Sequence, residues 1–147
     1  MSTNRRKFTG LLVAALIFPY RFLAAWPKNA FRATSSKDAL IALGPHGKKP
    51  VESNRVILNA PQIAENGALV PISVTTDLEG VKRISVLVAN NPNPLAADFE
   101  LSPVSIPEIK VKVKLGESSP VTAAVETKEK LYTKSQEVKV TLGGCGG

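Results

Sequence analysis

The stretch Ile109-Lys110-Val111-Lys112-Val113-Lys114-Leu115 alternates strictly between apolar and basic side chains. A period of two places successive side chains on opposite faces of a β-strand, so the apolar residues face a core and the lysines face outward. Outward lysines on a strand usually protect the edge of a sheet from pairing with another chain, and we favour that interpretation over the binding of an anion or an acidic partner. The stretch therefore predicts one half-buried strand of a sheet.

Short apolar segments bounded by turn residues lie on both sides of this stretch. The other expected strands are 56–58, 69–75, 81–89, 98–101, 120–127 and 132–142. No helical pattern separates them, which is typical of an antiparallel β-sandwich of the immunoglobulin type. Within 81–89 the apolar residues fall on both faces, which predicts burial between two layers or by a second chain.

Turn residues indicate where the chain reverses or pairing is limited. Asn66-Gly67 is a turn signal because this pair tolerates positive φ. Pro71 places its strand at the edge of a sheet, or places itself at the start of a strand. The run Asn90-Asn91-Pro92-Asn93-Pro94 is interpreted as a long connection between strands in preference to a binding loop.

The amino terminus has the pattern of a bacterial export signal. Arg5-Arg6 is followed by Phe8 and by the apolar run 10–18, whose nine residues are too few for a membrane-spanning helix of about 20. The twin arginine indicates the twin-arginine route to the periplasm, with cleavage expected after Ala25. An uncleaved membrane anchor is the alternative, but Arg21 interrupts the apolar segment.

Four regions are expected along the chain. They are a signal peptide over 1–25, an N-terminal segment over 26–50, a β-sandwich over 51–142 and a glycine-cysteine arm over 143–147. The N-terminal segment contains one predicted short helix, which Ser35 or Ser36 caps and Gly44-Pro45 stops.

Removal of the signal changes the charge of the protein. The chain has 19 Lys and Arg against 12 Asp and Glu, and four of the basic residues lie in 1–25, which leaves 15 and a net charge of +3. Aromatic residues are few and the lysines are dispersed, so we expect no nucleic-acid partner and, after cleavage, no membrane partner. His46 is the only histidine, which excludes a multi-histidine metal site, and we expect no cofactor.

The only cysteine, Cys145, lies between Gly143-Gly144 and Gly146-Gly147. Four glycines oppose fixed secondary structure and leave the segment slim, and five extended residues reach roughly 16–18 Å. No Lys, Arg or His lies within five residues to activate the thiol, and the expected terminal carboxylate disfavours a thiolate. One cysteine forms no internal disulfide, so we expect it to pair between chains or to be modified by a partner enzyme.

Taken together, several features resemble the SoxY family, the sulfur carriers of bacterial thiosulfate oxidation. They are the terminal Gly-Gly-Cys-Gly-Gly, the twin-arginine signal on an all-β domain, and the runs Ala60-Pro61-Gln62-Ile63-Ala64-Glu65-Asn66-Gly67, Val70-Pro71 and Asn91-Pro92-Asn93-Pro94. The resemblance implies that Cys145 attaches sulfur intermediates covalently. It implies that the four glycines are a flexible arm, and that the protein is a carrier without catalytic residues of its own.

The resemblance also implies a set of partners. SoxZ, a second small immunoglobulin-like protein, would form a heterodimer with the chain, and we expect it to contact 81–89. The haem-containing cytochrome SoxAX would join thiosulfate to the cysteine, and the metal-dependent hydrolase SoxB would release sulfate. In some systems the molybdenum–haem dehydrogenase SoxCD would oxidise the remaining sulfane sulfur. A disulfide between two Cys145 residues would give a dimer of heterodimers.

Two alternatives remain open at this stage. A structural or adhesion module would use Cys145 only to crosslink chains. A ubiquitin-like sulfur carrier would bear a thiocarboxylate on its last glycine, but such carriers are activated in the cytoplasm and the export signal argues against that chemistry.

Overall fold

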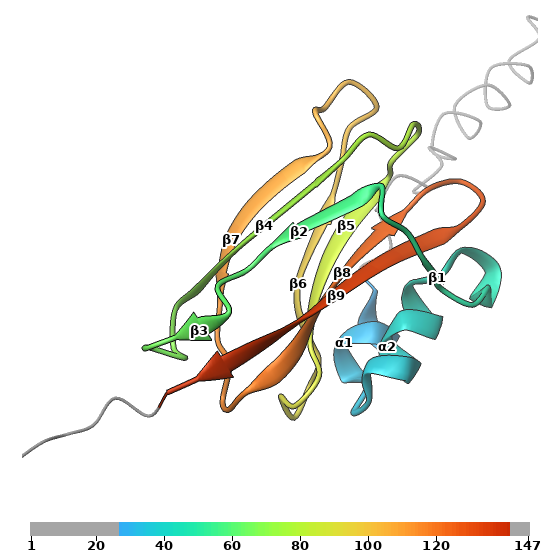
Figure 1. Cartoon of the computed structure of the whole chain (residues 1–147). Helices are drawn as coiled ribbons and strands as arrows, with labels where there is room; N and C mark the ends of the chain where they lie inside the picture. Colours follow the sequence, from blue (N-terminus) through green and yellow to red (C-terminus); the bar gives the residue numbers. More distant parts are fainter. Residues whose placement is uncertain (1–26, 142–147) are drawn as a thin grey trace, which may run out of the picture.

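The computed structural model describes residues 27–141. It has two α-helices, one 3-10 turn and nine strands within that range (Figure 1). Their bounds are α1 Lys28–Arg32, α2 Ser36–Leu43, η1 Pro45–Gly47, β1 Val51–Glu52, β2 Val56–Asn59, β3 Ile63–Ala64, β4 Val70–Thr76, β5 Arg83–Val88, β6 Leu95–Glu100, β7 Glu108–Val113, β8 Ser119–Glu126 and β9 Leu131–Val140.

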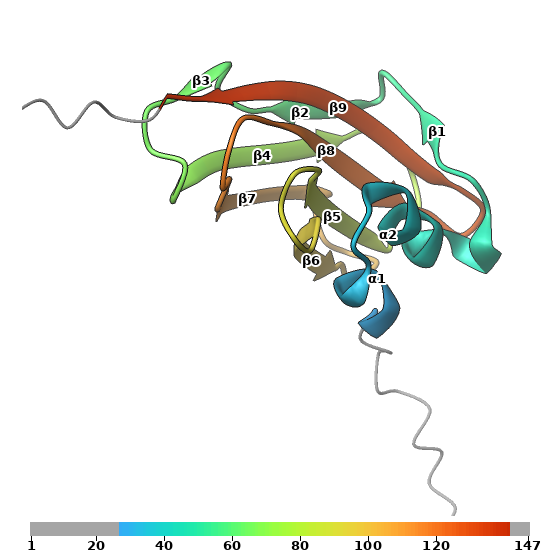
Figure 2. The same ribbon diagram turned by 90° about the horizontal axis from the view of Figure 1, so that it is seen from below.

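The strands form two sheets that pack face to face as an immunoglobulin-like sandwich (Figure 2). One sheet has the order β1-β9-β8-β5-β6, with β3 also paired to β9, and the other has the order β2-β4-β7. The expected all-β sandwich is therefore confirmed. The pairing is not wholly antiparallel, because β1 and β3 both run parallel to β9, at its start and at its end.

The alternating stretch lies on β7, at an edge of the three-stranded sheet, as its pattern predicts. Ile109, Val113 and Leu115 are buried in the core between the sheets, whereas Lys110 and Lys112 are exposed. Alternation predicts this arrangement directly because each residue's face depends only on its position along the strand.

Pro71 is the second residue of β4, so the prediction that it lies at a strand's start is confirmed. The alternative of an edge strand is wrong, because β4 is central in its sheet. The pairing of β2 with β4 ends at Asn59 and Ser73, so at Pro71 the strand is paired only with Lys112 of β7. A residue without an N–H is tolerated there because no β2 residue is paired with it.

The helix expected after Ser35 is α2. The Oγ of Ser35 accepts a hydrogen bond from the Asp38 amide at 3.1 Å, and the helix ends before Gly44. The five-residue α1 was not predicted, because it is too short to show a helical period. Within residues 27–141, neither helix is long and apolar enough to cross a bilayer.

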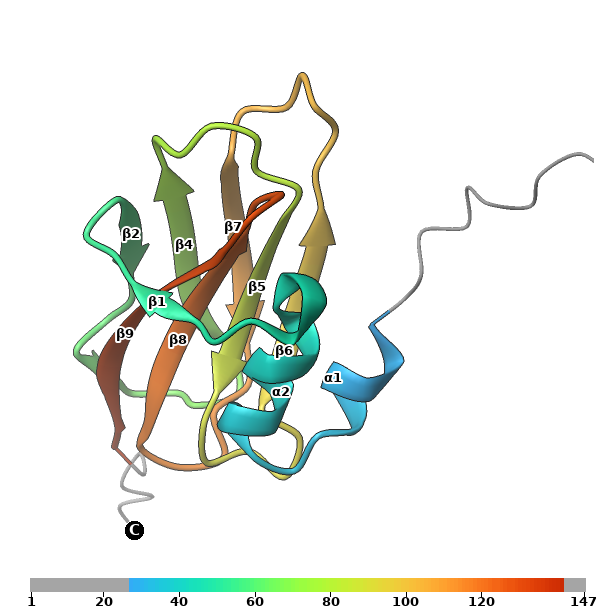
Figure 3. The ribbon, with the colours of Figure 1, turned by 90° about the vertical axis from the view of Figure 1, so that its right-hand side faces the viewer.

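Both helices cover the outer face of the larger sheet (Figure 3). Ala39 and Leu43 of α2 pack in one buried cluster with Leu87 of β5 and Leu131 of β9, while Val86 faces the other sheet. The two apolar faces of β5 are therefore buried within this chain. The expectation that 81–89 contacts a partner subunit is wrong, because the protein's own helices occupy the face that a partner would need.

Candidate functional site

The predicted attachment site lies outside the described residues. Cys145 and the arm glycines Gly143, Gly144, Gly146 and Gly147 follow Thr141, the last described residue. The export-signal residues Arg5, Arg6 and Phe8 precede the described part in the same way. What the structure shows of the site is its base, the end of β9 at Val140 and the following Thr141, which is four residues before Cys145 in the sequence.

One side of this base is held by β3. The amide of Lys139 donates to the carbonyl oxygen of Gln62 at 2.9 Å, and the amide of Thr141 donates to that of Ala64 at 3.0 Å. Ile63 and Ala64 lie opposite Lys139 and Val140 in a parallel register. The short β3 therefore continues pairing on this edge of β9 to the end of the strand.

The other side of the base is held by the connection between β7 and β8. The amide of Val140 donates to Oγ of Ser118 at 2.9 Å, just beyond the last β8–β9 pair, Ser119 and Val138. The amides of β9 thus alternate, with Lys139 and Thr141 donating to the β3 side and Val140 to the Ser118 side. Hydrogen bonds therefore hold residues 139–141, the last of the described chain, from both sides.

Two asparagines fasten the connection that supplies Ser118. Asn90 donates from Nδ2 to the carbonyl oxygen of Ser118 at 2.8 Å, and its amide donates to Oγ of Ser119 at 3.0 Å. Asn91 donates from Nδ2 to the carbonyl oxygen of Lys114 at 2.8 Å and accepts from the Gly116 amide at 3.2 Å. The run that begins at Asn90 is therefore a connection between strands, as expected, and it also supports the base of the arm.

Gly67 closes the same end of the sandwich. A Cβ built on it would lie 2.5 Å from the carbonyl oxygen of Leu115 and 3.0 Å from Cγ1 of Val140. The amide of Leu115 donates to the carbonyl oxygen of Gly67 at 2.7 Å. Gly67 is not among the residues with positive φ in the described range, which include Gly47 and Gly80. The reason for glycine at this turn is close approach, not the positive φ that the Asn-Gly pair suggested.

A separate cluster of ionisable residues lies on the larger sheet. Nη1 of Arg83 lies 2.9 Å from Oδ2 of Asp98, and its Nε lies 3.3 Å from Oε2 of Glu126. Ser85 donates from Oγ to the second carboxylate oxygen of Asp98 at 2.7 Å. The side chain of Asp98 is only 7% exposed, so both of its oxygens take their partners inside the protein. Sequence reasoning missed this cluster, since its members lie on three different strands.

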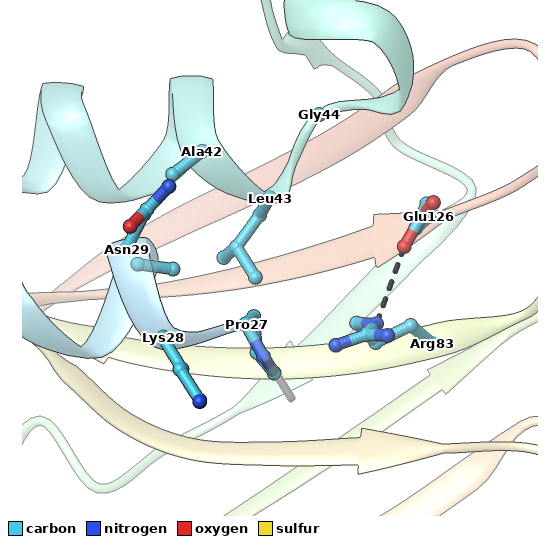
Figure 4. Close-up of a pocket in the computed structure, with 9 residues that line it drawn as sticks. Pro27, Lys28, Asn29, Ala42, Leu43, Gly44, Arg83 and Glu126 are labelled. Atoms are coloured by element: carbon cyan, nitrogen blue, oxygen red, sulfur yellow. Dashed lines mark ion pairs between the residues drawn. The ribbon is translucent and has the colours of Figure 1, made fainter. Parts of the chain in front are cut away.

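A pocket of about 440 Å³ lies between this cluster and the N-terminal helices (Figure 4). Arg83 and Glu126 form one wall, and Pro27 and Leu43 lie on the other side. Burial raises the pKa of the Glu126 carboxyl, and the neighbouring Arg83 opposes that rise. Both charged side chains are engaged with each other, so we interpret the cluster as a structural ion pair.

The described residues were also compared with the kinds of cluster that hold a metal ion. Within residues 27–141 there is no group of three or more His, Cys, Asp or Glu side chains that could hold a metal ion. His46 lies in η1, the turn that directly follows α2 in the chain. The base of the arm therefore provides positioning, through backbone hydrogen bonds and close packing.

Comparison with known proteins identifies the family of this chain. The family model of the sulfur oxidation protein SoxY matches residues 44–145. The solved structure of the sulfur carrier protein SoxY from Chlorobium limicola f thiosulfatophilum is 35% identical, with a TM-score of 0.58 over 63% of this chain and 84% of that chain. No curated protein sequence matches.

Two other solved structures are much less similar to this chain. Chains from a T-cell superantigen structure with toxic shock syndrome toxin-1 and from the human zinc 2-glycoprotein–prolactin inducible protein complex are 9% and 10% identical, with TM-scores of 0.42 and 0.39. The family match covers more than two thirds of the chain and includes both the segments that fasten the end of β9 and Cys145. The chain belongs to the SoxY family of sulfur oxidation proteins.

Proposed function

We propose that this protein carries sulfur-compound intermediates, derived from thiosulfate, covalently on Cys145 and presents them to successive enzymes. The observation that supports this most directly is the fixed end of β9, whose amides are bonded on alternate sides up to Thr141. Only Leu142 and two glycines separate that end from the cysteine. A rigid base next to a glycine-flanked thiol suits a group that must enter the active sites of other proteins.

The carrier chemistry requires a thiol and two kinds of partner reaction. Joining thiosulfate to Cys145 forms one sulfur–sulfur bond, releases the thiol proton and passes two electrons to the c-type haem of an oxidising partner such as SoxAX. Hydrolysis, assigned to SoxB, then breaks the bond between the outer sulfane sulfur and the sulfone. Water supplies the added oxygen, sulfate leaves, and a persulfide stays on the cysteine. Where SoxCD is present, it would oxidise this sulfane sulfur.

A carrier of this kind supplies no general base of its own. Within residues 27–141, the charged side chains of Arg83, Asp98 and Glu126 are paired with one another. An enzyme would bring titratable groups together in a pocket beside its nucleophile. The activation of the Cys145 thiol is therefore assigned to the partner enzymes.

The proposal includes the location and the stable partner of the carrier. Arg5-Arg6 and Phe8 support export by the twin-arginine route, which carries folded proteins to the periplasm. Export in the folded state allows a heterodimer with SoxZ to leave the cytoplasm already assembled. Because Ile84–Val88 are buried within this chain, we expect SoxZ to bind another surface.

The test compares Cys145→Ser with the wild-type protein, each purified and exposed to thiosulfate and the oxidising partner. Mass spectrometry should find the thiosulfate adduct only on the wild type, and thiosulfate-dependent respiration should be lost in the variant. Adducts that survive Cys145→Ser, or unchanged respiration, would contradict the proposal. Unchanged respiration together with loss of a disulfide-linked dimer would instead favour a crosslinking module.

A second variant tests whether the position of the thiol on the arm matters, or only the presence of an exposed thiol. Ser105 is an exposed residue of the β6–β7 loop, so Ser105→Cys in the Cys145→Ser background restores one exposed thiol at another place. If the arm presents the thiol, the partner enzymes should not load this relocated cysteine. Equal loading of the two positions would show that the glycine arm has no role.

A further inference from the structure

The pocket of about 440 Å³ between the helices and the larger sheet opens where the described chain begins. Pro27, the first described residue, lines it together with Leu43 of α2 (Figure 4). Arg83 of β5 and Glu126 of β8 form the opposite wall. Trp26, the residue before Pro27, is therefore joined directly to a residue of the pocket.

The position of Pro27 is set by α1. Its carbonyl oxygen accepts a hydrogen bond from the Phe31 amide at 3.1 Å, and Ala30 is buried in the cluster that both helices form with the larger sheet. A residue that precedes proline is restricted to extended conformations, because the proline ring clashes with its backbone in other conformations. Trp26 therefore loses little backbone freedom when it takes up a defined place beside Pro27.

The sheet wall of the pocket has more negative than positive charge. Asp98 and Glu126 share the single guanidinium of Arg83. Both oxygens of Asp98 have hydrogen-bond donors, from Arg83 and Ser85, whereas the Glu126 carboxylate accepts no hydrogen bond from any residue between 27 and 141. The Glu126 side chain is only 19% exposed. A carboxylate that is largely buried in this way favours a covering group that supplies a donor.

Tryptophan is chemically suited to both walls of this pocket. Its indole has a large apolar surface, one N–H donor, and a face that attracts a guanidinium. Leu43 supplies an apolar contact, Arg83 a cation and Glu126 an acceptor. Pockets of about 300–1,000 Å³ hold small organic groups, so an indole can enter this one. Trp26 is the only tryptophan of the chain.

We propose that the indole of Trp26 occupies this pocket, where it donates its N–H to the Glu126 carboxylate and packs on Arg83 and Leu43. The cation–π contact and the hydrogen bond to a charged acceptor together favour the docked form by roughly tenfold or more. The docking does not depend on the carrier chemistry of Cys145. It is available to the chain before and after the expected cleavage behind Ala25, since Trp26 precedes Pro27 in both forms.

The pocket forms only when the larger sheet is folded. Arg83 and Glu126 are distant in the sequence and lie directly opposite each other in the pairing of β5 with β8. Docking of Trp26 therefore fastens the segment between the signal peptide and the body only after these strands have paired. In the proposed twin-arginine export, which carries folded proteins, this contact would distinguish a folded passenger beside its own signal. That consequence rests on the proposed export, whereas the docking itself does not.

The experiment uses the full mature chain, which begins at Trp26, labelled with ¹⁵N and with any copurifying partner subunit left unlabelled. Because the chain has one tryptophan, a single indole N–H signal reports on Trp26. This signal should lie away from its position in urea, and a soluble paramagnetic agent should broaden it roughly tenfold less than in urea, in line with the docked population. The amide signals of Leu43 and Arg83 should shift in Trp26→Ala.

Matched variants assign the contact to Glu126. Glu126→Gln removes the charge of the acceptor, so the indole signal should move toward its position in urea and regain part of its broadening. Glu137→Gln, which changes an exposed glutamate of β9 outside the pocket, should alter neither property. Acetylation of the amino terminus should also leave the shielding unchanged, because the indole makes the contacts and the α-ammonium does not.

Several results would overturn the proposal. The first is an indole signal that is broadened equally in the folded and the unfolded chain. Shielding that is indifferent to Glu126→Gln, or Leu43 and Arg83 amides that do not respond to Trp26→Ala, would mean that the indole lies elsewhere. Shielding that requires the partner subunit, or that is lost on acetylation, would assign it to the partner or to the α-ammonium instead. If Glu126→Gln does not fold, the response of Leu43 and Arg83 to Trp26→Ala decides alone.

Discussion

Leu115 and Gly67 approach each other so closely that a methyl group on Gly67 would lie 2.5 Å from the carbonyl oxygen of Leu115. The same pair is joined by a hydrogen bond of 2.7 Å from the Leu115 amide to the Gly67 carbonyl oxygen. Val140 lies against the same glycine, so three segments that are distant in the sequence meet beside the base of the arm.

Gly67→Ala is therefore expected to destabilise the protein by about 1–3 kcal/mol, the usual cost of forcing extra atoms into a packed site. Because the atom in the way belongs to the backbone, it has no rotamer by which to move aside. Urea unfolding measures the change. Gly116→Ala is the matched control, since its Cβ would meet nothing closer than 3.8 Å, and it should stay within about 0.5 kcal/mol of wild type. Equal effects of the two substitutions would contradict the close-approach role of Gly67.

Ser118→Ala tests whether the side-chain hydroxyl holds the end of β9. Ser118 is exposed, so water replaces it and the global free energy of unfolding should change by less than about 1 kcal/mol. The local effect should be larger, with faster hydrogen exchange at the Val140 amide. Ser118→Thr keeps the hydroxyl and should restore the slow exchange. Unchanged exchange in Ser118→Ala would show that the hydroxyl does not hold the strand.

Arg83→Met tests the charge cluster on the larger sheet. Removing the guanidinium leaves the nearly buried Asp98 carboxylate without its cation, which should cost about 3–5 kcal/mol. Arg55→Met is the matched control, because the side chains of Arg55 and Asp77 are 55% and 73% exposed and such pairs contribute about 0–1 kcal/mol. Thermal or urea unfolding compares the two variants, and similar losses would refute the buried-pair argument.

Glu126→Gln is expected to change how stability depends on pH. Burial raises the pKa of Glu126 above its ordinary value of 4.5, so the folded protein holds this proton more tightly than the unfolded chain does. The free energy of unfolding contributed by this group therefore falls as the pH rises from about 4.5 through the raised pKa. Across that window the variant should gain stability relative to wild type. Urea unfolding at several pH values measures the difference in free energy of unfolding between the variant and wild type. A difference that stays constant, or that changes in favour of wild type as the pH rises, would contradict the expected direction.

Replacing Gly144 and Gly146 with valine tests the arm itself. The added branched side chains widen and stiffen the segment, so reactions with every partner enzyme should slow while the unfolding transition stays unchanged. Single-turnover loading and release of the Cys145 adduct provide the measurement. Unchanged rates with all partners would refute the need for a slim arm.

Sequence patterns correctly predicted those elements whose formation depends on residues close together in the sequence. The alternation on β7 and the cap of α2 at Ser35 were confirmed because each depends on neighbours in the sequence. β1 and β3 are two residues long each and pair with a strand that is distant in the chain, so no period could reveal them. The run from Ala60 to Gly67 was noticed for its resemblance to the family, and only the structure shows that it holds the end of β9.

The predicted partner surface failed for a related reason. Apolar residues on both faces of β5 indicate burial on both faces, and this was confirmed, but the pattern does not say what covers them. Ala39 and Leu43 cover Leu87, and α1 and α2 are too short for their packing to be predicted from periodicity. The sequence predicts Cys145 as the attachment site because it is the only cysteine and is flanked by glycines, and this stays a prediction because Cys145 lies outside the described residues. Its supports could not be predicted, since Ser118, Asn90 and Gly67 act through long-range contacts.

The hydrogen bonds on both edges of β9 have a mechanical consequence. Under the proposed function, an enzyme that draws the arm into its active site pulls along the strand that precedes it, and the ladders to β8 and to β1 and β3 lie across that direction. Such a load shears many bonds at once instead of peeling them one after another. In the proposed carrier, the force from each enzyme would be distributed over the whole sheet, and the end of β9 would keep its position while the adduct is transferred.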